Sequence, residues 1–194
     1  MGNTSNIAAG KPKITGAIFV AKTGTELPTD AKTELNKEFK QMGYISDNGL
    51  ENENKIDSDK VKAWGGDTVM TLQKEKTDKF GYELLEVLNV DVIKFVYGEN
   101  NVSGTLKTGI DILANSEEPE TRTVVVDMIM GKALKRIVIP SAKLSDLEKI
   151  TYKDTEPVGY KVTVTAFPYE FKDKKTGTHR EYVVEKTVQE ESGA

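Results

Sequence analysis

The residues that could do chemistry are few, and none of them falls into a catalytic pattern. The sequence has one histidine and no cysteine, which excludes disulfides, thiolate metal sites and cysteine nucleophiles. His179 lies among Lys, Gly and Thr residues, so we expect an exposed turn residue rather than a metal ligand or a triad member. Gly131-Lys132 lacks the upstream glycine and the following Ser or Thr of a phosphate-binding loop. The sequence therefore predicts no metal, no cofactor and no enzyme.

Acidic side chains are plentiful, with 31 Asp and Glu against 27 Lys and Arg. Such a count leaves room for a glycosidase-like carboxylate pair, but aromatic residues make up only 7% of the chain, which disfavours a sugar site. The acidic, Asn-rich stretch 46–54 lacks the ligand spacing of a calcium loop. A net charge of −4 argues against a dedicated binder of phosphate backbones, yet it suits a surface that DNA passes without sticking.

The length of 194 residues predicts one domain. We expect a flexible N-terminal arm over 1–13, a single domain over 14–188 and a C-terminal tail over 189–194. The chain has no basic stretch followed by an apolar run near its first residue, and no run of about 20 apolar residues. These features predict neither a secretory signal nor a membrane segment.

Most of the regular structure is expected to be β. Alternating or β-branched runs occur in several segments, which predict antiparallel strands: 14–21, 68–73, 79–88, 104–113, 121–130, 134–139, 160–167 and 180–187. The charged residues 74–78 are interpreted as the reversal of a hairpin over 68–88, and Pro140 as the end of a strand. The pattern contains no βαβ rhythm, and it favours an antiparallel β-sandwich or barrel-like fold with a helix at its flank.

Two segments have helical features. Residues 90–97 follow a potential N-cap, Asn89, and precede Gly98, and Asp91 is favourably placed in the first turn. A second helix is predicted over 30–42, where apolar residues recur at spacings of three and four before Gly43.

The long polar segment 47–66 is predicted to be a loop that ends at the only tryptophan, Trp64. Two interpretations of Trp64 remain open at this point. The side chain can close one end of the core, or it can anchor a subunit interface, where Trp is enriched. The neighbouring Gly65 and Gly66 permit unusual backbone angles or close approach, which suits either interpretation.

Several short segments between Gly16 and Gly104 resemble the major tail protein, or tail tube protein, of long-tailed phages that infect Gram-positive bacteria. The order and approximate spacing of these segments are also similar to the family. The segments are 16–21 (GAIFVA), 27–31 (LPTDA), 43–50 (GYISDNGL), 62–67 (KAWGGD), 86–92 (EVLNVDV) and 96–98 (VYG).

The resemblance implies a non-catalytic tail tube fold whose protomers form hexameric rings that stack into the tube of the virion tail. Assembly would take place in the host cytoplasm. DNA would pass through the lumen without specific binding. The implied partners are further copies of the chain, a tape-measure protein and tail-tip and terminator proteins.

By the same resemblance, contacts between subunits or rings involve residues 1–13, the segment 47–66 and the C-terminal tail. The interface residues implied in the segment are Asn48, Leu50, Ile56, Val61, Trp64, Gly65 and Gly66. The hairpin 68–88 would be a candidate lining of the lumen. Two alternatives stay open: a tube protein of a contractile injection or type VI secretion apparatus, and a monomeric β-sandwich that serves as a binding or adhesion module.

Overall fold

The computed structural model describes residues 2, 4–13 and 17–186. The first residues of the strand predicted at 14–21 and the tail 189–194 lie outside the described residues. The elements in chain order are η1 (Thr4–Asn6), β1 (Gly10–Pro12), β2 (Ile18–Lys22), β3 (Lys40–Gln41), β4 (Ile45–Lys62), β5 (Thr68–Leu84), α1 (Val90–Tyr97), η2 (Glu99–Asn101), β6 (Val102–Thr105), β7 (Gly109–Ile112), β8 (Thr121–Met130), β9 (Ala133–Leu147), β10 (Tyr160–Ala166), β11 (Tyr169–Glu170), β12 (Thr176–Gly177) and β13 (Arg180–Glu185).

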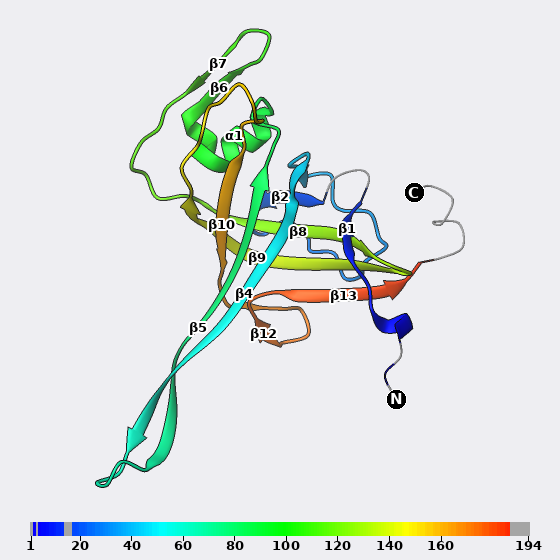
Figure 1. Cartoon of the computed structure of the whole chain (residues 1–194). Helices are drawn as coiled ribbons and strands as arrows, with labels where there is room; N and C mark the ends of the chain where they lie inside the picture. Colours follow the sequence, from blue (N-terminus) through cyan, green and yellow to red (C-terminus); the bar gives the residue numbers. More distant parts are fainter. Residues whose placement is uncertain (1, 3, 14–16, 187–194) are drawn as a thin grey trace.

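One large antiparallel sheet organises the chain, in the order β3-β2-β8-β9-β10-β5-β4. The long strand β9 shares one of its edges between two partners, because residues 133–138 pair with β13 and residues 142–147 pair with β10. As a result, β8, β9 and β13 cross the direction of β10, β5 and β4 (Figure 1). The prediction of a mainly β antiparallel fold with a flanking helix is confirmed, although the described sheet does not close into a barrel.

The main core joins the two crossed halves of the sheet and the helix. Most of its members come from β5, β10, β8, β9 and α1, with others from β2 and β6, and they include Phe80, Tyr82, Leu84, Val162, Val164, Val124, Val126, Ile137, Ile139, Val92, Ile93 and Val96. The neighbouring Val125 belongs to a second, smaller cluster. Because successive side chains of a strand point to opposite faces, β8 is buried on both of its faces.

The helix α1 forms as its sequence predicts. The Asn89 side chain accepts a hydrogen bond from the Asp91 backbone N–H at 3.0 Å, and the Gly98 N–H donates to the Lys94 carbonyl at 2.9 Å. Val92, Ile93 and Val96 are buried on its inner face. The cap, the acidic first turn and the apolar stripe all favour a helix, so residues 89–98 are sufficient to predict this element.

The second helix, predicted over 30–42, does not form, and that prediction is wrong. Residues 25–42 instead cover the second cluster with Leu27, Leu35 and Phe39, and they contain only turns and the short β3. The buried Arg136 explains the difference, because its guanidinium donates to the Asp30 carbonyl at 3.0 Å and to the Thr33 carbonyl at 2.7 Å. A helix needs those carbonyls for its own i to i+4 bonds.

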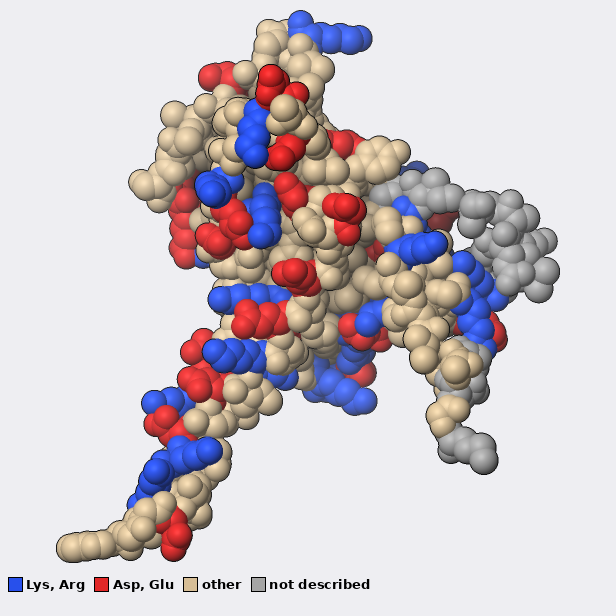
Figure 2. Space-filling view, viewed as in Figure 1, with Lys and Arg blue, Asp and Glu red and all other residues tan. Residues whose placement is uncertain are grey.

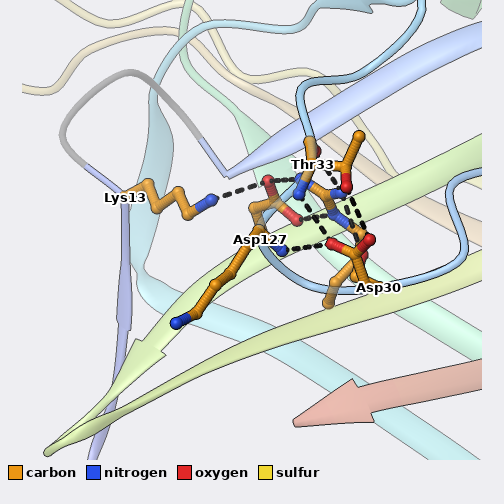
Figure 3. Close-up of polar contacts among 6 residues, drawn as sticks. Lys13, Asp30, Thr33 and Asp127 are labelled. Atoms are coloured by element: carbon orange, nitrogen blue, oxygen red, sulfur yellow. Dashed lines mark hydrogen bonds and ion pairs between the residues drawn. The ribbon is translucent and has the colours of Figure 1, made fainter. Parts of the chain in front are cut away.

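A buried ion pair holds this guanidinium in place. Arg136 and Asp127 are 2% and 3% exposed, and two charge-assisted hydrogen bonds of 2.6 and 2.7 Å join them. Lys13, from the N-terminal arm, reaches the same Asp127 carboxylate at 3.1 Å (Figure 3). Residues Gly10–Pro12 of the predicted flexible arm pair with β8. The arm and the segment 25–42 are thus fastened to one buried charge pair.

Two further predictions about strand ends are wrong. Pro140 lies inside β9, where a register shift opposite Arg122 and Val124 accommodates it, as expected of proline at a bulge. The second concerns the segment 47–66, predicted as a loop, and the reversal predicted at 74–78. The structure instead has two long paired strands, β4 with 18 residues and β5 with 17 residues, which reverse at 63–67.

Candidate assembly surface

The outer part of the β4–β5 hairpin projects away from the body of the molecule (Figure 1). We call residues 56–76 the outer hairpin; every residue in this range is exposed. The inner end of β5 is different, because Asp78, Phe80, Tyr82 and Leu84 are buried. The six residue steps from Ile56 to Lys62, at about 3.3 Å per residue, give the outer strands a reach of roughly 20 Å.

The turn at the tip exposes the single tryptophan. The Ala63 N–H donates to the Asp67 carbonyl at 2.8 Å, and the Gly66 N–H donates to the Ala63 carbonyl at 3.0 Å. Gly65 and Gly66 have φ values of 115° and 98°, a region that side chains with a Cβ avoid. Trp64 is 106% exposed. The interpretation of Trp64 as a core residue is therefore wrong.

The register of the hairpin separates its side chains into two faces of different character. Opposite residues of an antiparallel pair lie on the same face. One face carries Val61 opposite Met70, Asp59 opposite Leu72, and Asp57 opposite Glu75. This face, which we call the acidic apolar face, therefore combines three aliphatic side chains with three carboxylates.

The opposite face is basic and polar. It carries Ile56 opposite Lys76, Ser58 opposite Gln73, Lys60 opposite Thr71, and Lys62 opposite Thr68. Lys74 and Val69 fall at the two register shifts, where a strand contains one extra residue. The Lys74 ammonium lies 2.7 Å from the Asp59 carboxylate. Figure 2 shows the alternation of acidic and basic side chains along the projection.

Five of the seven predicted interface residues lie in the outer hairpin: Ile56, Val61, Trp64, Gly65 and Gly66. Ile56 is 58% exposed and Val61 is 40% exposed. The other two lie at the base, where Asn48 is exposed and Leu50 packs against the main core. The structure therefore does not bring all seven together.

Sequence reasoning missed three apolar residues of the same surface. Val69, Met70 and Leu72 are 62%, 55% and 50% exposed. The sequence pattern places them in one strand of a hairpin over 68–88, which does not predict that they lie beside Trp64. The signal that could have found them is the pair of glycines at 65 and 66, which is a better turn than the charged residues 74–78.

A buried carboxylate holds the base of the hairpin. The Asp78 side chain accepts hydrogen bonds from Thr178 Oγ1 at 2.5 Å and Asn52 Nδ2 at 2.9 Å, and it lies 2.6 Å from His179 Nδ1. Burial works to raise the pKa of Asp78, but the hydrogen bonds from Thr178, Asn52 and His179 outweigh burial and lower that pKa below its ordinary value.

His179 is therefore not the exposed turn residue that its neighbours in the sequence suggest. Its side chain is 16% exposed, and its ring packs edge-on against Phe80 with the ring centroids 5.2 Å apart. Through Asp78 it ties the segment after β12 to the point where β5 leaves the body. The contact between His179 and Asp78 therefore helps to fix the position of β5 at the base of the hairpin, and the sequence alone does not predict this contact.

Within residues 2, 4–13 and 17–186, no group of three or more His, Asp or Glu side chains could hold a metal ion. Over the same residues, no helix is both long enough and apolar enough to span a bilayer. What the described surface does offer is a projecting ribbon that exposes apolar side chains.

Comparison with known families agrees with that picture. The family model for phage tail tube proteins matches residues 3–189. The chain belongs to the phage tail tube protein family. No curated protein matches the sequence significantly. Tail tube proteins are structural rather than catalytic, they assemble with copies of themselves, and their place is the virion tail. The predictions of the tail tube protein family and of a non-enzymatic role are confirmed.

Proposed function

We propose that this chain forms hexameric rings that stack into the tail tube of a long-tailed phage of Gram-positive bacteria, and that the tube conducts the genome during delivery. Its proposed partners are neighbouring copies of itself, a tape-measure protein inside the tube, and tail-tip and terminator proteins at its ends. Assembly would take place in the host cytoplasm.

The outer hairpin is the observation that carries the proposal. A two-stranded ribbon is only marginally stable in water, and its free backbone edges invite pairing with another chain. Beyond Lys79, where the pairing of β5 with β10 ends, the described ribbon has no third strand. Its apolar side chains are at least 40% exposed. Contact with a neighbouring copy would pair the edges and cover these side chains.

The proposed interface comprises the base residues Asn48 and Leu50 together with Ile56, Val61, Trp64, Gly65 and Gly66. Trp64 is its anchor, since a large aromatic side chain buries about 150–250 Å² and dominates the interfaces in which it is enclosed. The two glycines keep the tip narrow, so that the indole can enter a site on the next subunit.

The charge of the chain supports the proposed conduit. Six copies at a net charge of −4 each would carry a formal charge of about −24. A lumen with a basic excess would hold DNA through counterion release, whereas an acidic or neutral lining would let DNA slide. We therefore expect no net positive band around the channel. Within the segment 68–88, the inner part of β5 is our candidate for the lumen lining, because its outer part belongs to the proposed interface.

The single tryptophan makes the proposal directly testable. Because Trp64 is fully exposed in the monomer, its fluorescence should shift to shorter wavelength and become less accessible to acrylamide as the protein is concentrated. Electron microscopy of the same samples should show tubes with a central hole. A protein that remains monomeric by light scattering at high concentration, including after addition of tail-tip proteins, would contradict the proposal.

The genes beside this one can distinguish a long-tailed phage from the remaining alternative, the tube of a contractile injection or type VI secretion apparatus. A tape-measure gene without a sheath gene supports the long-tailed phage. A sheath gene beside this one would instead assign the tube to a contractile apparatus, and the ring proposal would survive in that changed setting.

A further inference from the structure

A cavity of about 510 Å³ opens on the body of the molecule between the end of β2, the start of β8, the helix α1 and residues 37–42. Its volume lies within the range of about 300–1,000 Å³ that is typical of sites for small ligands. Apolar side chains line it, including Val20, Ala21, Met42 and Phe95. The cavity is therefore large enough, and apolar enough, for one aromatic side chain.

The lining of this cavity has a net positive charge, because it contains five cations (Lys22, Lys37, Lys40, Lys94 and Arg122) and three carboxylates (Glu38, Asp91 and Glu99). Lys22, Lys37 and Lys40 line it and are exposed, and none of the three has an ion-pair partner among the described residues. The other two cations of the lining are already paired, because Lys94 lies 2.8 Å and Arg122 lies 3.5 Å from the Glu99 carboxylate. Lys37 and Lys40 are thus available to a ligand that carries carboxylates, whereas Lys22 also acts on the Glu99 carboxylate and helps to lower its pKa.

The acidic apolar face of the outer hairpin has the matching chemistry. It presents Asp57 and Glu75 beside its aliphatic residues, while Asp59 is already paired with Lys74 at 2.7 Å, and the tip adds Trp64 and the exposed Asp67. Trp64 would fill the apolar floor of the cavity while the carboxylates meet the lysines of the rim. The basic face of the ribbon would repel the same rim, so only one orientation of the ribbon suits the site.

The tip cannot fill the cavity of its own chain. In Figure 1 the tip lies at one end of the molecule, and α1, which forms one wall of the cavity, lies at the other. The donor and the acceptor are different surfaces, so the contact they make between two copies is heterologous. Contacts of this kind propagate head to tail into rings or helical arrays.

We propose that the Trp64 tip and the acidic apolar face of one copy dock in this cavity of a second copy. The inference rests on the proposed self-assembly and names the two surfaces that meet. Residues 187–194, which contain two glutamates, are the competing occupant, and the first experiment below distinguishes the two.

Disulfide trapping can test the contact without interference from native thiols, because the chain has no cysteine. Ala63→Cys places a thiol beside the intact Trp64, and Lys37→Cys places one on the rim. Equimolar mixing under mild oxidation at an assembling concentration should give a 63–37 disulfide dimer. Lys132→Cys, at the exposed β8–β9 turn, is the matched control and should give none. Lys40→Cys repeats the measurement from a second rim position.

The outcomes separate the docking site from self-assembly. One outcome would contradict the docking site but not self-assembly. In that outcome, tubes form and the Trp64 emission shifts to shorter wavelength, but disulfides form only between two Ala63→Cys chains or with Lys132→Cys. A rim disulfide to Glu190→Cys, in place of Ala63→Cys, would assign the cavity to the C-terminal residues. The absence of both tubes and an emission shift would contradict the proposed function itself.

Charge reversal gives an independent check. Lys37→Glu should raise the concentration needed for assembly roughly two- to fivefold, as expected for one exposed ion pair. Mixing Lys37→Glu chains with Asp57→Lys chains should restore the contact in which the hairpin of an Asp57→Lys chain docks in the cavity of a Lys37→Glu chain. Lys60→Glu, on the basic face, is the matched control and should leave this contact unchanged. An equal effect of Lys37→Glu and Lys60→Glu would contradict the proposed orientation.

Discussion

The inner and outer halves of the same two strands differ in what stabilises them. In the inner half of β5, Phe80, Tyr82 and Leu84 are at most 3% exposed, whereas Met70 and Leu72 in the outer half are at least 50% exposed. The inner half packs against the body of its own chain, and the outer half has no such support among the described residues. A single pair of strands can thus serve folding at one end and assembly at the other.

The largest effects are expected from substituting one aromatic residue in each half, which tests whether the inner half serves folding and the outer half serves assembly. Phe80→Ala should lower the free energy of unfolding by about 3–5 kcal/mol, because it leaves a cavity at a fully buried site. Trp64→Ala should change it by less than about 0.5 kcal/mol, while assembly should weaken by about 2 kcal/mol or more. Urea denaturation and sedimentation velocity measure the two quantities. Unfolding of the monomer by Trp64→Ala would refute the distinction.

Arg136→Ala tests whether the body depends on its buried charge pair. The substitution leaves the buried Asp127 carboxylate with the Lys13 ammonium, 3.1 Å away, as its remaining cationic partner, and it opens the contacts to the segment 25–42. We expect a loss of about 3–5 kcal/mol in the free energy of unfolding, with increased hydrogen exchange in residues 25–42. Arg136→Met, which keeps much of the volume, combined with Asp127→Leu should recover part of that loss. No recovery in the double variant would argue against the lost Arg136–Asp127 pairing as the cause.

Asp78 sits at the boundary between the two halves, and its ionisation should affect stability. Its pKa is lowered in the folded state, so the stabilisation is present above the ordinary unfolded pKa of about 3.9 and is lost as the pH falls through the lower folded pKa. Asp78→Asn should cost about 1–3 kcal/mol at pH 6. The difference between the two proteins should shrink below about pH 4 in urea titrations. A difference that stays constant down to pH 2 would exclude Asp78 ionisation as its source.

The smallest expected effect is confined to the tip. Gly66→Ala places a Cβ at a φ of 98°, which should cost about 1–2 kcal/mol of local strain. Because the outer hairpin has no packing partner in the described chain, global unfolding should hardly change, while amide exchange at residues 61–70 should increase. Gly2→Ala, where a Cβ would meet nothing within 4 Å, is the control. A clear loss of global stability would show that the tip and the body unfold together.

Local signals and long-range contacts account for what could and could not be predicted. The helix over 90–97 follows from its cap, its apolar stripe and Gly98, all within ten residues of one another. The segment 30–42 has an equally regular apolar spacing, yet Arg136, about 100 residues further along the chain, takes its carbonyls. Nothing near residues 30–42 in the sequence signals that contact.

The same contrast applies to the assembly surface. The resemblance implies an interface role for Trp64 and its two glycines, but the polar, turn-forming residues in 47–66 predict a loop. Residues 50–62 form a strand because β5 pairs with them from Leu50 opposite Tyr82 to Lys62 opposite Thr68. A ribbon exposed on both faces has no burial pattern, so alternation could not identify it.

Local patterns and composition are enough to predict the mainly β class, the capped helix and the lack of catalytic patterns, and the resemblance adds the family. The folded chain is needed to show that the hairpin projects, that Trp64 is exposed at its tip and that one face of the ribbon is acidic and apolar. It is also needed to show that the body carries a cavity whose lining has a net positive charge. Those properties depend on strand register and on which distant segments pack together, and neither is encoded in any single stretch of the chain.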